Sequence, residues 1–394
     1  EGTPITEVQK LCDVHSALFH GTTDYSNKHE KSAALSQVKG HPLQTFTREN
    51  EALTKLIDRM KELLHDTDET TGSGSLPVDE KQADTGNLPQ IAAQLLKIRE
   101  VAVHYAKKGD LLYPHLNARY GIAGPSAVMW TADDEIRDEL GALCKALQKG
   151  REAAEQRATE SFPSSQWDVK WLERLQKVLM RAEEMIYKEN HILFPNCAVN
   201  FTEEDWMGIY RDAKDYADCL GVHGEVWEEA KNWLRKEKEA KKTVFKGTKD
   251  SQASEGEEDR AGSNFSDGVI HMPGGHMTIR QLTALLNTIP LEISFIDAED
   301  RNCYFNEGPK VFKRAQMALG RSVFTCHPPK VETMVRRIIG EFREGTLDRV
   351  PVWMDKGGRT MLVTYMAVRD ESGEYMGTME LVQDMEFAKE HFGK

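Results

Sequence analysis

Histidine and carboxylate side chains on separate helical stretches are the residues of this sequence that could bind a metal. His41 and Glu49 lie on one stretch, His104 on the next, and Glu189 on a later one. Imidazoles and carboxylates that project inward from facing helices are the usual ligands of iron sites in helix bundles. A single His or Glu on an amphipathic helix is usually a solvated or capping residue. The prediction of a metal site therefore depends on several of these side chains converging.

The elements that would position these residues are long amphipathic helices. Apolar residues with helical spacing predict helices over residues 41–64, 88–113, 126–147 and 167–194. Pro114 and Pro195 close the second and fourth of these, in the similar sequences LLYP and ILFP, and Thr202 begins a further helix with Asp205 at capping-box spacing. Polar stretches at 66–87 and 149–165 predict loops. This pattern predicts an all-α, antiparallel four-helix bundle.

The periodicity changes near residue 268, after a segment with almost no apolar residues. Residues 291–297, 302–306, 359–369 and 377–383 alternate like strands, and helical patterns lie at 279–288 and 331–344. We therefore predict a multidomain chain. Residues 36–242 form the bundle, 243–268 form a flexible linker, and 269–394 form an α+β domain with an antiparallel sheet.

The composition excludes several classes of protein. The sequence is 39% hydrophobic and 29% charged, which is enough apolar material for two cores. Its net charge of −13 argues against nucleic-acid binding, because a phosphate partner needs a basic surface. No apolar run is long enough to span a membrane, and the six cysteines are widely separated. These features predict a soluble, cytoplasmic protein.

Four segments together resemble the hemerythrin-like (HHE cation-binding) family. They are GHPLQTFTREN, HYAKKGDLLYP, GPSAVMWTADDEIR and MIYKENHILFP, at residues 40–50, 104–114, 124–137 and 185–195. In addition, VQKLCDVHSALF at residues 8–19 resembles the end of an uncharacterised domain that precedes such domains, which implies that residues 1–24 end an N-terminal helical domain. The resemblance implies a carboxylate-bridged pair of non-heme irons that meets O₂, NO or peroxide. It implies the ligands His41, His104, Glu135 and Glu189, with His15 and Glu49 as additional ligands.

The sequence departs from the family pattern at several of these positions. Lys108 stands where the family has Glu, and Met185 and Glu135 stand where it usually has His. Gly109 and Asn190 stand where the most similar branch usually has Glu. Further ligands or hydrogen-bonding neighbours of a metal could be Asp110, His115, Asp134, His191, Tyr105 and Tyr187. A mononuclear or heme-type site and a metal-free bundle therefore remain as alternatives to a di-iron site.

Residues 279–386 resemble a PAS domain, through NTIPLEISFIDAEDRNCYFNEG and VTYMAVRDESGEYMGTMELVQD among other segments. Such a domain encloses a small ligand pocket and could form a homodimer. Within the sequence TCHPP, His327 and Cys326 are candidate pocket ligands for heme. The alternative is that TCHPP is a rigid turn that opens the following helix.

The two resemblances lead to one main functional prediction and two alternatives. The main prediction is a hemerythrin-like sensor of O₂, NO or redox state, coupled to a PAS signalling domain. The first alternative is a non-heme iron enzyme that activates oxygen and is regulated by the PAS domain. The second is a heme-binding or metal-free interaction module. The predicted partner is a diatomic or other small molecule.

Overall fold

The computed structural model describes residues 25–69, 88–121, 124–156, 169–246, 268–308 and 310–392. The chain divides into two compact units, Glu1–Trp227 and Glu228–Lys394. The predicted N-terminal domain, including His15, and nearly all of the predicted linker lie outside the described residues. Among the helices in the described ranges, none is both long enough and apolar enough to cross a bilayer.

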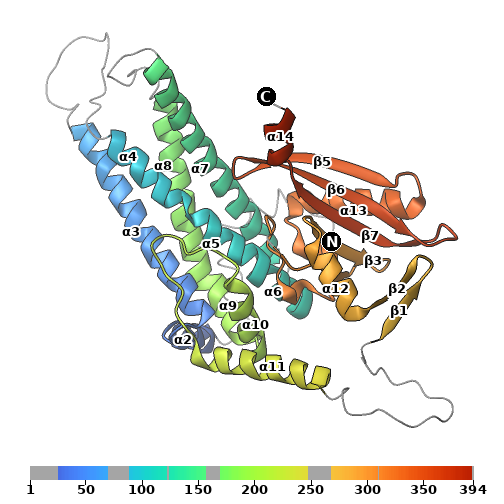
Figure 1. Ribbon diagram of the computed structural model, residues 1–394. Coiled ribbons are helices and arrows are strands. Elements are labelled where there is room, and N and C mark those ends of the chain that lie inside the picture. The colour runs from blue at the N-terminus through green and yellow to red at the C-terminus, as the bar shows by residue number, and fades with distance from the viewer. Residues whose placement is uncertain are drawn as a thin grey trace. The chain divides into compact units, whose positions relative to one another are not determined.

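Four long helical columns form the core of the first unit (Figure 1). They comprise α3 (Pro42–Glu69), α4 (Leu88–Arg99) continued by α5 (Val101–Lys107), α7 (Gly124–Gln156) and α8 (Val169–Lys188). Helix α3 contacts α4 and α8, and α7 contacts the same two helices, so the columns close into a four-sided bundle. Buried apolar residues such as Leu53, Leu95 and Leu179 fill its interior. The predicted helical bundle is confirmed.

A π-helical turn interrupts both the second and the fourth column. The first is η3 (Lys108–Leu112), followed by α6 (Tyr113–Tyr120), and the second is η5 (Glu189–Leu193), followed by α9 (Phe194–Asn200). In each turn, the backbone N–H just before the proline bonds the carbonyl five residues earlier. Proline has no N–H to continue an α-helical ladder, and a wider turn accommodates this loss. The two prolines were predicted to end their helices, but both helical paths continue through them.

Shorter helices complete this unit: α2 (Tyr25–Ser36) and α10 (Glu203–Ala213). Thr202 and Asp205 form the predicted capping box, in which each side chain accepts a hydrogen bond from the other residue's backbone N–H. Gly40 has a φ of +76°, and a Cβ there would lie 2.4 Å from the backbone nitrogen of Trp227. Glycine fits this position just before α3 because it has no Cβ and tolerates a positive φ.

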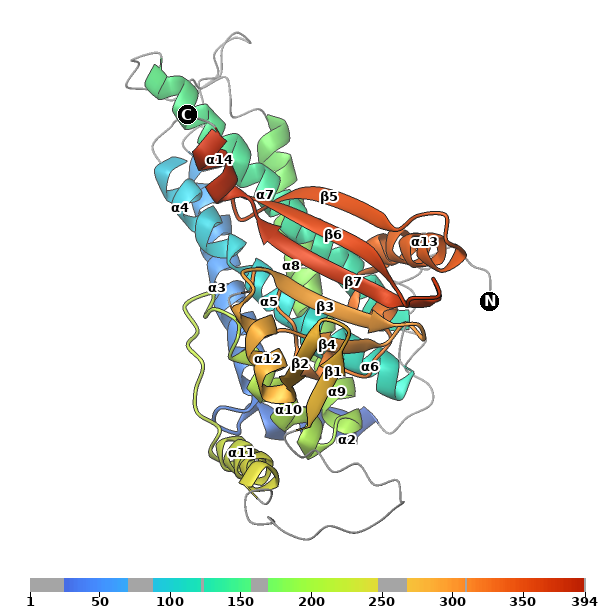
Figure 2. The ribbon, with the colours of Figure 1, turned by 45° about the vertical axis from the view of Figure 1, so that its right-hand side comes forward.

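The second unit begins with α11 (Glu228–Lys246) and contains two sheets. A hairpin joins β1 (Val269–Met272) to β2 (Gly275–Thr278). The five-stranded sheet has the order β4-β3-β7-β6-β5 and is antiparallel throughout (Figure 2). Its strands are β3 (Glu292–Asp297), β4 (Asn302–Phe305), β5 (Arg349–Lys356), β6 (Arg359–Arg369) and β7 (Tyr375–Asp384). The α+β fold is confirmed, although β1, β2 and β5 were not predicted from the sequence.

The helices of the second unit include α12 (Ile279–Thr288), α13 (Pro329–Glu344) and α14 (Glu386–Phe392). Helix α13 contacts β6 and β7, and its Val335 and Ile339 pack with Ile296 of β3. We call the side of the sheet that carries Ile296 the inner face. Because strand side chains alternate, Glu292 and Ser294 share this face with Ile296.

Candidate functional site

Three of the predicted ligands meet at the centre of the bundle. His104 on α5 is fully buried, and its ring lies between carboxylates of two other helices. The distance from Nδ1 to Oε2 of Glu49 is 2.7 Å, and the distance from Nε2 to Oε2 of Glu189 is 2.9 Å. Both carboxylates accept hydrogen bonds, so both ring nitrogens must carry a proton. The geometry therefore describes an imidazolium cation held between two anions.

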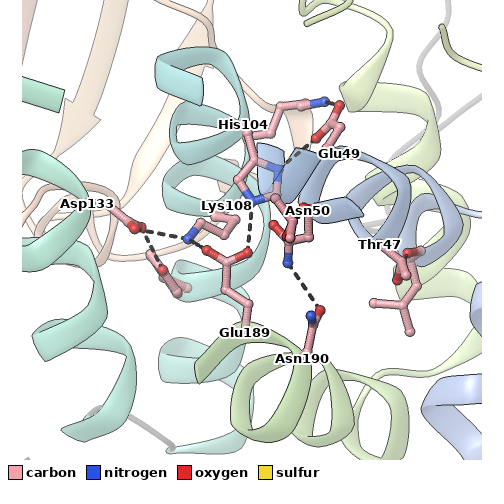
Figure 3. A network of polar contacts seen from close by, with 12 residues as sticks. Thr47, Glu49, Asn50, His104, Lys108, Asp133, Glu189 and Asn190 are labelled. Carbon is pink, nitrogen blue, oxygen red and sulfur yellow. Dashed lines mark hydrogen bonds and ion pairs between the residues drawn. The ribbon is translucent and has the colours of Figure 1, made fainter. Parts of the chain in front are cut away.

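Lys108 occupies the space beside this histidine (Figure 3). Its side chain has no solvent exposure, and its Nζ donates to Glu189 and, at 2.9 Å, to Oδ1 of Asp133 on α7. The other carboxylate oxygen of Asp133 accepts a hydrogen bond of 2.7 Å from the Tyr113 hydroxyl. The ammonium also lies 4.4 Å from the centre of the Tyr105 ring, within cation–π range. The Lys108 ammonium therefore pairs with two carboxylates and also contacts an aromatic ring.

Lys107 supplies a second ammonium, beside the Glu49 carboxylate. Its Nζ donates to the Glu49 oxygen that His104 does not use, and the side chain is almost completely buried. We refer to the following six residues as the buried charge cluster: Glu49, His104, Lys107, Lys108, Asp133 and Glu189. With His104 protonated, three cations face three carboxylates.

The pKa shifts follow from burial and these ion pairs. Burial opposes the charged ring of His104, but the Glu189 and Glu49 carboxylates outweigh it and raise the pKa of the ring. Burial also opposes ionisation of Glu189, but Lys108 and His104 lower its pKa below the ordinary value. For Asp133, burial dominates over the attraction of Lys108, and its pKa is raised.

His41 lies apart from the buried charge cluster. Its ring is 1% exposed and packs at centroid distances of 4.7 Å against both Trp206 and Trp227. Nδ1 accepts a hydrogen bond of 3.1 Å from the backbone N–H of Leu43 and so caps the start of α3. Burial lowers the pKa of His41 to about 3. The ring is therefore a neutral capping and packing group.

The predicted third-helix ligand also lies away from the cluster. Glu135 is exposed and forms an ion pair with Arg181. Asp134 is buried, but its carboxylate pairs with Arg137 on the same helix at 2.6 Å. Neither side chain is brought together with His104.

Two other candidates have local partners. Asp110 accepts a hydrogen bond of 2.6 Å from the Tyr216 hydroxyl. His115 is buried, and its Nε2 lies 2.8 Å from Oδ1 of Asp205, the capping residue of α10. These contacts tie α10 and the segment after it to the second column.

The remaining candidates divide between the surface and the core. His191 and Tyr187 are exposed, with ring centroids 4.3 Å apart. Tyr105 is buried, and its ring contacts the Lys108 ammonium. Tyr105 is therefore the one of these three that borders the buried charge cluster.

The structure also explains what occupies three positions where the sequence departs from the family. A Cβ at Gly109 would lie 3.0 Å from Nε1 of Trp130, so a side chain there would require the indole to shift by a few tenths of an ångström. Met185 is buried in the bundle. Asn190 accepts a hydrogen bond of 3.1 Å from Asn50.

Asp133, Lys107 and Lys108 were not predicted from the sequence as residues of the site. The signal for Asp133 was its spacing, because it falls with Met129 and Ile136 on the buried stripe of α7, whereas Glu135 does not. The signal for Lys108 was its spacing, because it follows the buried His104 by one helical turn and so lies on the same face. A lysine on a buried face is almost always paired with a carboxylate.

A second polar cluster lies in the other unit, on the inner face of its sheet. Glu380 pairs in register with Tyr365 on β6 and with Ser294 on β3, so the three share a face. Nη2 of Arg314 donates to Oε2 of Glu380 at 2.5 Å, and the Tyr365 hydroxyl is hydrogen-bonded to the same carboxylate. Burial, followed by the charge of Glu380, raises the pKa of Tyr365. Nε of Arg314 is buried with no hydrogen-bond partner among the described residues.

His327 and Cys326 lie close to this second cluster and are partly buried. Nδ1 of His327 donates to the carbonyl of Val323 at 2.8 Å, and burial lowers the pKa of the ring. A neutral ring that donates through Nδ1 keeps a lone pair on Nε2. Glu380 and Arg314 both act electrostatically on His327. Sγ of Cys326 lies 3.5 Å from the Asn302 side-chain nitrogen.

Family models match three parts of the chain. Residues 41–197 match the hemerythrin HHE cation binding domain, and residues 282–386 match a PAS domain. Residues 1–25 match a family of unknown function (DUF438). The chain is therefore a hemerythrin HHE domain followed by a PAS domain, which is the composition of a signalling or sensor protein. An HHE domain implies a cation-binding site, usually for iron.

Three solved structures with similarity to the chain each match about a third of it or less. The C-terminal domain of a protein from Streptococcus mutans is 36% identical, with 32% of this chain and 97% of that one covered and a TM-score of 0.31. A sensory box sensor histidine kinase from Vibrio cholerae is 12% identical, with coverage of 27% and 90% and a TM-score of 0.21. The Aer2 receptor from Vibrio cholerae, described as a dual PAS-heme oxygen sensor, is 20% identical, with coverage of 24% and 94% and a TM-score of 0.19. No curated protein matches the chain.

The buried charge cluster does not fit the iron pair that the HHE family implies. A metal ligand needs a free lone pair, but both nitrogens of His104 face carboxylates, and a lysine ammonium has none to offer. The carboxylates of Glu49 and Glu189 each already pair with a lysine and with the histidine. Across the described ranges, no set of three or more His, Cys, Asp or Glu side chains is placed to hold a metal.

Proposed function

We propose that this protein is a signalling protein whose PAS domain receives the signal as a small ligand bound at the inner face of its sheet. The ligand would carry a hydrogen-bond acceptor, such as a carboxylate or carbonyl group. The observation that carries the proposal is the buried Nε of Arg314, which has no partner among the described residues. A buried donor without a partner costs free energy that a ligand oxygen would recover.

The surroundings of Arg314 support such a polar ligand. Glu380 on β7 pairs with the guanidinium, and Tyr365 on β6 is hydrogen-bonded to that carboxylate, so the donor is positioned before a ligand arrives. Glu292 and Ser294 add buried polar groups on the same face. PAS domains commonly bind small molecules and form dimers, and a homodimer of this chain remains a prediction.

Mass spectrometry of molecules that copurify with the full chain tests this proposal. The protein, Arg314→Met and a surface control, Arg337→Met, are purified in the same way, denatured, and their released small molecules compared. Arg337 on α13 is mostly exposed, so its replacement leaves the inner face intact. We expect one species in the extracts of the wild type and the control that is strongly reduced for Arg314→Met. Identical extracts from all three proteins would contradict the proposal.

Heme is a second candidate ligand of the PAS domain, favoured by the state of His327. Its proton is fixed on Nδ1 by the Val323 carbonyl, and a neutral Nε2 is the form in which imidazole binds heme iron. Titration of the full chain with hemin, followed by visible spectroscopy, tests this candidate. A Soret band that His327→Ala abolishes would support it, and an equal band in both proteins would exclude His327 as the ligand.

Iron-based sensing of O₂, NO or redox state, and an iron enzyme, would both require the bundle to hold iron. The residues of the buried charge cluster do not fit that role, so we do not extend either activity to this chain. We propose instead that the bundle is a helical signalling module fixed by internal ion pairs.

A further inference from the structure

Three carboxylates in the bundle of this protein pair with cationic side chains of the same chain. Glu49, Asp133 and Glu189 come from three separate helical columns and are nearly or completely buried. Buried carboxylates remain ionised only when cations compensate them. Each of these three contacts at least one buried ammonium, and two of them also contact the His104 ring.

Lys108 is the cation with the most complete set of neighbours. Its ammonium lies between carboxylates of η5 and α7, and the rings of Tyr105 and Tyr113 lie 4.4 and 5.8 Å away. The side chain reaches this position from the first residue of the π turn η3, and Glu189 begins the matching turn η5. The two π turns therefore bring opposite charges together at the centre of the domain (Figure 3).

We infer that the ammonium of Lys108 takes the place of the metal in this cation-binding fold. The domain keeps a cation in its interior, and that cation is covalently part of the chain. It is present whatever the supply of metal, and it undergoes no redox change. The helical unit is thus a fixed ion-paired scaffold, and the cluster has no vacancy for an external ion while Lys108 remains.

Removal of the internal cation should make room for an external one. Lys108→Met keeps most of the volume of the side chain but leaves Asp133 and Glu189 facing each other beside His104 without the ammonium. A divalent ion that accepts carboxylate oxygen, such as Zn²⁺, suits these two carboxylates. The wild-type cluster should reject the same ion.

Thermal unfolding of the full chain with and without Zn²⁺ tests this inference. We expect Lys108→Met to lower Tm by about 10 °C, because it leaves buried carboxylates uncompensated. Addition of Zn²⁺ should restore at least half of that loss. The matched control is Lys61→Met, which removes a half-exposed lysine paired with Glu183 at 2.5 Å. The control and the wild type should gain no Tm from Zn²⁺.

The double variant Lys108→Met with Glu189→Gln separates rescue at the cluster from binding elsewhere, because it should not regain Tm with Zn²⁺. A Lys108→Met protein that is destabilised but not restored by Zn²⁺ would overturn the inference. If that variant does not fold, equilibrium dialysis of the wild type against Zn²⁺ still decides the matter. Binding by the wild type that disappears in Glu189→Gln would overturn the inference, and its absence would support it.

Discussion

His41 offers a direct test of how burial changes stability with pH. The ring is enclosed by two tryptophans, and burial lowers its pKa from 6.5 to about 3. In the unfolded chain the same ring takes up a proton below pH 6.5, whereas in the folded chain it stays neutral until pH is near 3. The stabilisation present above 6.5 is therefore lost as pH falls through this window.

The magnitude follows from the difference in pKa. Each unit of difference corresponds to about 1.4 kcal/mol, so His41 alone should destabilise the protein by about 2 kcal/mol between pH 7 and pH 5. The limiting loss, near the folded pKa, is about 5 kcal/mol. Other groups titrate in the same range, so the contribution of His41 must be isolated by a variant.

His41→Asn is that variant, because an Asn side-chain oxygen can accept the Leu43 N–H in place of Nδ1 but does not titrate. Urea unfolding followed by tryptophan fluorescence gives the free energy of unfolding at pH 7 and pH 5. The difference between the two pH values should be about 2 kcal/mol smaller for His41→Asn than for the wild type. The control His223→Asn, at a mostly exposed histidine, should keep most of the wild-type difference. An unchanged pH dependence in His41→Asn would show that protonation of His41 does not contribute to the loss of stability.

Three further predictions concern stability and use the same urea assay. Glu189→Gln should lower the free energy of unfolding by about 3 kcal/mol, because it breaks buried ion pairs. Glu183→Gln, in a partly exposed ion pair, should change it by less than about 1 kcal/mol. Equal losses would show that burial does not strengthen the effect. Gly40→Ala should destabilise the protein by about 2 kcal/mol or more, because φ is positive there and a backbone atom lies 2.4 Å from the new Cβ. Gly141→Ala, at a position on α7 with open space around the new Cβ, should stabilise the protein by up to about 1 kcal/mol. A larger loss of stability for Gly141→Ala than for Gly40→Ala would contradict this packing. Thr202→Ala should cost about 1 kcal/mol through loss of the capping box, and a neutral effect would show that the cap contributes nothing.

Much of the fold could be predicted from the sequence because it follows from local patterns. The helical stripes gave the four columns of the bundle, and Thr202 with Asp205 gave the start of α10. The prolines in LLYP and ILFP were misleading, since each is accommodated by a π turn and the helical path continues. The strand β5 was missed because its residues alternate only partly, with Pro351 inside an edge strand.

The site was harder to predict because it depends on how side chains from distant segments pair. His104, Glu49 and Glu189 were identified, since buried polar residues on apolar stripes stand out. Glu135 was chosen over Asp133 although only Asp133 lies on the buried stripe of α7. Spacing alone did not reveal that lysines would fill the interior, because a Lys on a helix is normally solvated.

Iron analysis of the purified full chain tests whether Lys108 closes the cation site of the bundle. The protein is produced with ample iron, and the iron content of the wild type is compared with that of Glu189→Gln. We predict that neither protein holds a stoichiometric amount of iron in the bundle. Stoichiometric iron in the wild type that is lost in Glu189→Gln would show that the cluster binds iron although Lys108 is present.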